Sequence, residues 1–466
     1  MIMKTRTIIL LAILAIGLAV FSAKVVLFLT AKPKVTIDYV AEYNAITFPA
    51  NYDPNENAAL YYQKALDTFV EMPRQLIGGG RGWPADFNDT QQVFFRAWLA
   101  SNSRAFEQFK IGAKKPYCWW QRQATHGCGM SELLFQEKYP PRHIIAAFMW
   151  KTKQDAVEER KQAVFDNILD CYKAGGQQCQ TPSLLAVQEF GLDFKRIAMS
   201  AALVILDKVV FDSVTLKSFQ DMLKTELDKD TYLPDLEAEK LLHNDLLQMV
   251  FVYNSNGTGR LTWNTAKDFI GACGQWNIFE VLRYCLIGPT QNQIAGQINE
   301  LFASFDSIKS KTPKQLYSYD HNYFMKIDTA CQDDLFFGFS ALNLHKIYYL
   351  YHKTRSRTEA VITVVAILRY KTDAGQYPES LDKLVSAGYL QSVPMDPYSD
   401  GPLVYKIAED NFKLYSVGEN FIDDGGIAFP SSSGDIVYWP VRRPETPKSS
   451  EETETVQKNP EPNQAE

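Results

Sequence analysis

Apolar side chains recur at the spacing of an α-helix through most of the first three quarters of the chain. One such pattern covers residues 58–66 and follows Asn57, a residue type that is common at helix N-caps. A second covers residues 156–172, and we expect Gly175 and Gly176 to end it as a C-cap. Others cover residues 181–208, 213–227 and 234–252. Because the connections are short, antiparallel neighbours are favoured, and the pattern predicts a mainly α-helical body over residues 35–330.

The pattern changes in the last quarter of the chain. A long helical pattern starts near residue 333 and continues through residue 370. After Gly375, β-branched and aromatic residues dominate the runs 403–407 and 412–417, which predict a hairpin, and residues 436–438 offer a third strand. We therefore expect a mainly α fold class, in which a body of antiparallel helices carries a small C-terminal α+β domain over residues 331–440. Residues 441–466 are rich in Pro and Glu and are expected to be disordered.

The N-terminal segment is apolar from residue 8 to residue 30, apart from a short interruption around Lys24, and basic residues flank it on both sides. Two interpretations compete. In the first it is a cleaved signal peptide with Ala23 at the cleavage position. In the second, which we favour, residues 1–34 are an uncleaved signal anchor, because residues 8–30 are long enough to cross ~30 Å of hydrocarbon. The sequence then predicts a single-pass inner-membrane protein whose partner is the membrane and whose body lies in the periplasm.

Composition supports a folded, exported body without a nucleic-acid partner. The 466 residues are 46% apolar and 22% charged, which is typical of a globular chain of two or three domains. The formal net charge of −6 argues against nucleic-acid binding, which needs a basic surface over the phosphates. Protein partners in the cell envelope remain the expected class.

Seven cysteines are present, and six of them fall into pairs with short separations. In an exported chain this spacing predicts local disulfides, whereas buried free thiols are the alternative. The expected pairs are Cys118/Cys128, Cys171/Cys179 and Cys273/Cys285.

The loop between residues 416 and 435 carries the strongest candidate chemistry. Calcium prefers six to eight hard oxygen ligands from carboxylates, amides, carbonyls and water. Such side-chain oxygens come from Asn420, Asp423, Asp424 and Asp435. Glycines within the loop permit backbone conformations that turn carbonyl groups inward. The loop therefore predicts a calcium site, and the alternative is a polar turn with solvated acids.

The C-terminal segment also resembles the C-terminal domain of the major pseudopilin of bacterial type II secretion, over about residues 358–439. The resemblance is carried by a helix followed by Gly375-Gln-Tyr377-Pro378, then Asp396-Pro397-Tyr398, the strand runs and the loop before Asp435. It implies a pseudopilin-like α+β fold with calcium in that loop, where Asn420 takes the place of an aspartate and Phe421 replaces a glycine. The prepilin-peptidase site is missing, because residues 1–41 contain no glutamate and no Gly-Phe pair. Processing and polymerisation as a pilin are therefore not expected.

Other candidate chemistry is weaker. His126 and Cys128 are too close in sequence to indicate a Cys–His nucleophile, and Cys128 is better interpreted as a disulfide partner. Glu239 and His243 lie one helical turn apart without a second histidine to complete a metal motif, so an exposed helix surface is expected. The sequence thus predicts no catalytic residues. The leading hypothesis is a membrane-anchored envelope protein of binding or structural type. The alternatives are an accessory part of a secretion or pilus-like apparatus and an envelope enzyme acting through the helical body.

Overall fold

The predicted mainly α fold class is confirmed in its coarse form, with one small antiparallel sheet near the C-terminus. The fold is known from a computed structural model. It describes residues 14–23, 25–26, 30, 32–73, 82–124, 129–135, 142–180, 182–230, 233–252, 256–261, 265–266, 278–332, 337–408, 410–427 and 434–441.

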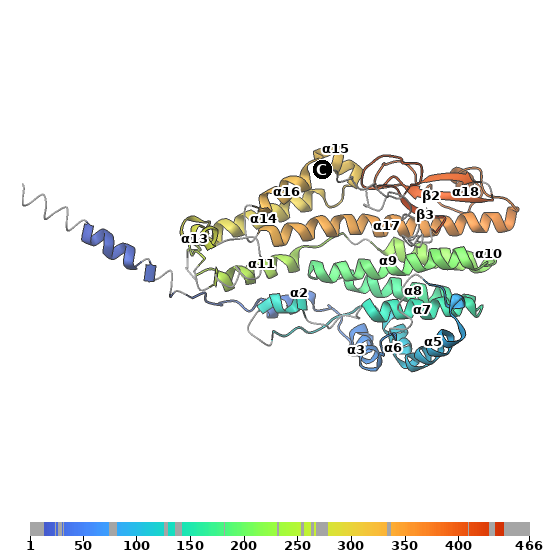
Figure 1. Ribbon diagram of the computed structural model, residues 1–466, viewed down its shortest axis with the longest axis horizontal. Helices are drawn as coiled ribbons and strands as arrows, with labels where there is room; N and C mark the ends of the chain where they lie inside the picture. Colours follow the sequence, from blue (N-terminus) through green and yellow to red (C-terminus); the bar gives the residue numbers. More distant parts are fainter. Residues whose placement is uncertain are drawn as a thin grey trace, which may run out of the picture.

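The helices lie in layers along the long axis of the molecule (Figure 1). The first layers contain α2 (Tyr39–Thr47), α3 (Ala58–Thr68), α5 (Asp89–Ser101), α6 (Ser103–Ala113), α7 (Arg142–Val157) and α8 (Lys161–Cys179). Next come α9 (Leu185–Lys208), α10 (Ser213–Lys229) and α11 (Glu237–Val250). The last helices are α13 (Ile278–Ile287), α14 (Gln291–Ile308), α15 (Pro313–Asp320), α16 (Tyr323–Gln332), α17 (Phe337–Ala374) and α18 (Leu381–Ser386). As predicted, the Asn57 side chain caps α3 by accepting a hydrogen bond from the Ala59 N–H group.

Helix α8 does not end at its glycines, and this corrects the predicted C-cap. It continues to Cys179, and Gly175 lies where α8 crosses α9. A Cβ atom on Gly175 would lie 2.4 Å from the carbonyl oxygen of Gly191, and one on Gly191 would lie 2.6 Å from the carbonyl oxygen of Gly175. The two glycines therefore allow the backbones of α8 and α9 to approach closely.

The predicted disulfide between Cys171 and Cys179 is wrong, because both residues are free thiols on α8. Eight residues of α-helix separate them by about 12 Å along the axis, beyond the ~7 Å limit for bridged Cα atoms. Cys118 and Cys285 are buried free thiols as well. Their expected partners, Cys128 and Cys273, lie outside the described residues.

The C-terminal sheet packs on α17. Its strands are β1 (Val404–Ala408), β2 (Asn411–Ser416) and β3 (Ile436–Trp439), in the order β1-β2-β3 with antiparallel pairing throughout. The sheet lies along the outer side of α17, and α9 and α10 pack on the helix as well (Figure 1). The buried residues 360–367 of α17 belong to one hydrophobic cluster with α8, α9, α10, β2 and β3. The core is therefore continuous across the predicted domain boundary at residue 331.

The predicted signal anchor over residues 1–34 is corrected by the structure. Within the described ranges, no helix combines the length and the apolar character needed to cross a bilayer. The single-pass inner-membrane location is corrected with it, whereas the membrane as a partner stays a prediction. Residues 1–13 and the predicted tail from residue 442 lie outside the described residues.

Candidate functional site

The loop that was predicted to bind calcium is held closed by carboxylates that accept backbone hydrogen bonds. Asp435 is buried, its Oδ1 atom accepts from the Asp424 N–H group at 3.2 Å, and its Oδ2 atom accepts from the Gly426 N–H group at 2.6 Å. Phe421 has a φ of 60°, in the left-handed region that favours glycine, and its ring packs 4.6 Å from that of Tyr317. The position where the resemblance implies a glycine thus keeps a glycine-like backbone.

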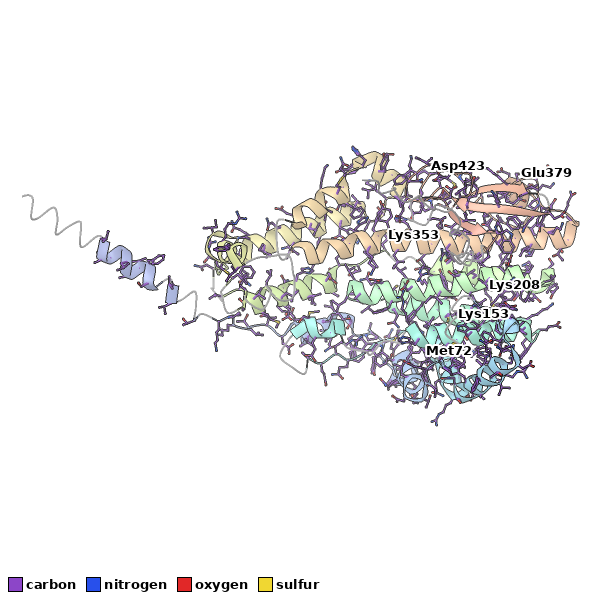
Figure 2. All side chains as sticks on the ribbon, viewed as in Figure 1. Met72, Lys153, Lys208, Lys353, Glu379 and Asp423 are labelled. Carbon is purple, nitrogen blue, oxygen red and sulfur yellow. The ribbon has the colours of Figure 1, made fainter. Side chains whose placement is uncertain are left out.

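The four predicted ligands do not all point to one place. Asn420 Nδ2 donates to Asp424 Oδ2 at 2.8 Å, which keeps those two side chains together. Asp423, labelled in Figure 2, instead accepts from the Tyr415 hydroxyl at 2.8 Å. The Gly425 N–H group and Tyr415 lower the pKa of its carboxyl. Across the described part of the chain, no group of three His, Cys, Asp or Glu side chains is arranged to hold a metal ion. A shell built partly from amide and carbonyl oxygens is not tested by this observation, so calcium binding stays a prediction.

A cavity of about 860 Å³ lies between the helical body and the C-terminal unit. Helix α17 forms its floor, α10 forms one wall, and residues 388–397 form the other. The start of α15 closes one end, where the Thr312 hydroxyl donates to Asp400 at 2.6 Å and the Lys314 N–H group donates to the Pro397 carbonyl at 3.1 Å. We call this cavity the α10–α17 cleft.

A polar clamp fixes the other end of the α10–α17 cleft. Arg369 of α17 donates to the Gln220 side chain of α10 at 2.6 Å, and Gln220 donates to the Tyr389 carbonyl at 2.8 Å. The Arg369 guanidinium also lies 5.0 Å from the centre of the Tyr389 ring. Although Arg369 is buried, its Nε atom has no hydrogen-bond partner among the residues that the structure describes. One donor of the clamp is thus left without a protein acceptor.

Two further groups on the floor are incompletely satisfied. Burial lowers the pKa of His352 to about 4, although a hydrogen bond to the Lys311 backbone acts in the opposite direction. The Nε2 atom of this neutral ring has no hydrogen-bond partner among the described residues. Burial raises the pKa of Glu359, while Lys224 and Arg355 act in the opposite direction. Among the described residues, no side chain forms an ion pair or hydrogen bond with the Glu359 carboxylate. The floor therefore offers a donor or acceptor at each of these positions.

A second cavity, of about 570 Å³, adjoins the first at Leu233 but differs in its polar groups. Lys195 of α9 is buried and pairs with Asp230 at 2.5 Å, and its Nζ atom lies 5.1 Å from the Tyr172 ring. Burial acts to lower the pKa of the Lys195 amine, but the interactions with Tyr172 and Asp230 outweigh this effect and raise the pKa, so the amine stays protonated. Because the charges at the bottom of this cavity satisfy each other, their arrangement indicates a structural role.

Sequence reasoning missed the buried polar pair on α11. Glu239 and His243 were expected on an exposed surface, but both are buried. The Glu239 carboxylate accepts from the Leu185 N–H group at 3.0 Å, at the first turn of α9, and burial raises its pKa to about 7. The Nδ1–H group of His243 donates to the Glu239 carbonyl oxygen at 2.7 Å. The apolar residues flanking both positions were the signal that this face of α11 is buried.

Comparisons with known proteins add no family to this description. No protein-family model, no curated protein and no solved structure matches the chain. The resemblance to the pseudopilin domain therefore stays a prediction, and the function must be argued from the cleft itself.

Proposed function

We propose that this protein is a non-enzymatic binding protein whose ligand occupies the α10–α17 cleft. The observation that carries the proposal is a pair of buried polar atoms without a hydrogen-bond partner among the described residues, Arg369 Nε and His352 Nε2, beside the partly buried carboxylate of Glu359. A buried polar group without a hydrogen bond costs about 1–3 kcal/mol, so such groups are rare in folded proteins. A bound ligand would supply the missing partners, which accounts for their retention in a cavity of ligand size.

In this proposal the C-terminal unit is a pseudopilin-like domain that serves as a wall of the cleft. Two contacts support this arrangement. The Tyr438 hydroxyl of β3 lies 2.7 Å from the Ser356 hydroxyl on the floor, and Lys353 of α17 pairs with Glu419 at 2.6 Å. The sheet is thus attached to the same helix that carries the polar groups, as Lys353 on α17 illustrates (Figure 2). A domain held in this way suits a fixed binding surface better than a subunit of a fibre.

A stability measurement tests the proposal without knowledge of the ligand. Binding-site groups are commonly retained at the expense of stability, so Glu359→Gln should raise or maintain the melting temperature. The matched control is Asp155→Asn, because Asp155 is fully buried and accepts from Lys151 at 2.6 Å and Asn167 at 2.7 Å. The control should lower the melting temperature. If Glu359→Gln lowers it by a similar amount, Glu359 is a structural partner and the proposed site is wrong.

A further inference from the structure

Residues 388–397 line one wall of the α10–α17 cleft over ten consecutive positions. Its two ends are held by backbone hydrogen bonds, such as Tyr389 N–H to Leu384 O at 2.8 Å and Leu403 N–H to Pro394 O at 2.9 Å. Between them, Gln391–Val393 make no main-chain hydrogen bond to any residue that the structure describes. The segment is neither helix nor strand. Its free N–H and C=O groups are of the kind that pair with an extended peptide.

The floor opposite this wall presents a cation beside an anion. Arg355 is exposed, its hydrogen bond to the Asp230 carbonyl is long, at 3.4 Å, and its guanidinium also interacts with the Tyr351 hydroxyl. A guanidinium has five N–H donors in a planar fork, so Arg355 retains donors that match a carboxylate. Glu359 lies one helical turn further on the same face of α17 and can accept an N–H group. A peptide that carries a carboxylate beside its own amide N–H groups satisfies both residues.

The charge balance of the lining favours a peptide over a polyanion. Four basic and four acidic side chains line the cleft, so its formal charge is zero. A nucleic acid or polyphosphate needs an excess of basic groups, whereas matched charges suit a ligand with both donors and acceptors. The volume of about 860 Å³ falls within the range of small-ligand pockets, which limits the bound part to a few residues.

We infer that the ligand of the α10–α17 cleft is a short extended peptide segment with an acidic side chain, whose carboxylate binds Arg355 and whose backbone pairs with Gln391–Val393. This inference rests on the proposed function and adds the class of ligand to it.

Fluorescence anisotropy with the full-length chain tests the inference. The probes are three labelled heptapeptide libraries with randomised flanks and a central Glu, Gln or Lys. We expect the Glu library to bind at least tenfold more tightly than the other two. Both Arg355→Glu and Arg355→Gln should remove this preference, with folding checked by circular dichroism. The matched control is Arg104→Glu, an exposed arginine of α6 outside the cleft, which should bind as the wild type does.

Three results overturn the inference. They are equal binding of the three libraries, no binding of any library at about 1 mM, and a Glu preference that survives both Arg355 variants. If free glutamate binds in an Arg355-dependent way and no peptide does, the peptide class is wrong while the cleft remains a binding site. Failure of the proposed function is recognised separately, because the Glu359→Gln stability measurement needs no ligand.

Discussion

Substitution of Gly175 by alanine tests the close crossing of α8 and α9. An added Cβ atom would meet the carbonyl oxygen of Gly191 at 2.4 Å and the Cγ atom of Lys195 at 2.9 Å. The oxygen belongs to the backbone of a buried helix and cannot turn aside. The adjacent Gly176 supplies the control, because a Cβ atom there has its nearest neighbour, Lys195 Cε, at an ordinary 3.9 Å.

The magnitude follows from two opposing terms. Alanine is favoured over glycine in a helix by up to about 1 kcal/mol, and this gain applies to both positions. Overpacking of a buried contact costs about 1–3 kcal/mol, and a clash with backbone lies in the upper part of that range. We therefore expect Gly176→Ala to be neutral or stabilising and Gly175→Ala to be the less stable variant by about 2 kcal/mol. In a chain of this size the gap corresponds to roughly 2 °C in melting temperature.

Thermal unfolding followed by circular dichroism measures the difference directly. The variant Gly191→Ala should behave like Gly175→Ala, because its Cβ atom would lie 2.6 Å from the Gly175 carbonyl oxygen. Once either alanine has separated the helices, the second should cost less, so the double variant should be less destabilised than the sum of the two. Equal melting temperatures for Gly175→Ala and Gly176→Ala would show that the helices do not cross in contact at Gly175.

Three other measurements follow from the buried charges and the C-terminal loop. Lys195→Met should lower the free energy of unfolding by about 3 kcal/mol, because it leaves Asp230 unpaired. Adding Asp230→Asn should restore part of this loss in a double-mutant cycle. If the effects of the two substitutions on the free energy of unfolding are additive, the two residues do not form a pair. Burial raises the pKa of Glu239 from 4.5 to about 7, so the folded state binds the proton more tightly than the unfolded state. Stability should therefore fall as pH rises from about 4.5 to 7, and Glu239→Gln should flatten this part of the melting-temperature profile. Calcium should raise the melting temperature of the full chain relative to chelator, and Asp435→Ala should remove that rise. Identical melting curves with calcium and with chelator would mean that the hydrogen bonds of Asp435 alone close the loop.

The sequence pattern predicted helices and strands correctly where the residues of the element itself determine its conformation. The alternation of β-branched and aromatic residues predicted the hairpin, whose register pairs Val404 with Tyr415, and the helical spacing predicted α17 as one long helix. The glycines of α8 were misread because a helix C-cap and a close helix crossing both need a residue without a side chain. A single sequence shows the glycine but not the neighbouring backbone. The same limit explains the disulfide error, because Cys171 and Cys179 are close in sequence but lie apart on one helix.

The α10–α17 cleft was not predictable, because its walls come from segments far apart in the chain. Gln220 and Arg369 meet across 149 residues, and their types give no sign of the pairing. Which polar atoms remain unsatisfied is also a property of the folded arrangement. The calcium loop shows the converse case, since its acidic residues were visible in the sequence. Their use of backbone N–H groups as partners, as at Asp435, became apparent only from the fold.

The position of α17 in the fold connects the proposed site to the stability of the whole chain. Its residues 360–367 lie in the hydrophobic cluster shared by the helical body and the sheet, and the preceding turns carry His352, Arg355 and Glu359 on the cleft floor. Because the α17 backbone is held by this cluster, a ligand on the floor cannot shift the helix without disturbing the core. The cleft is therefore expected to be preformed, so binding should order side chains at its surface with little change in the backbone of α17. A preformed floor also explains how the unsatisfied groups are kept in place, since the packing of residues 360–367 outweighs their cost.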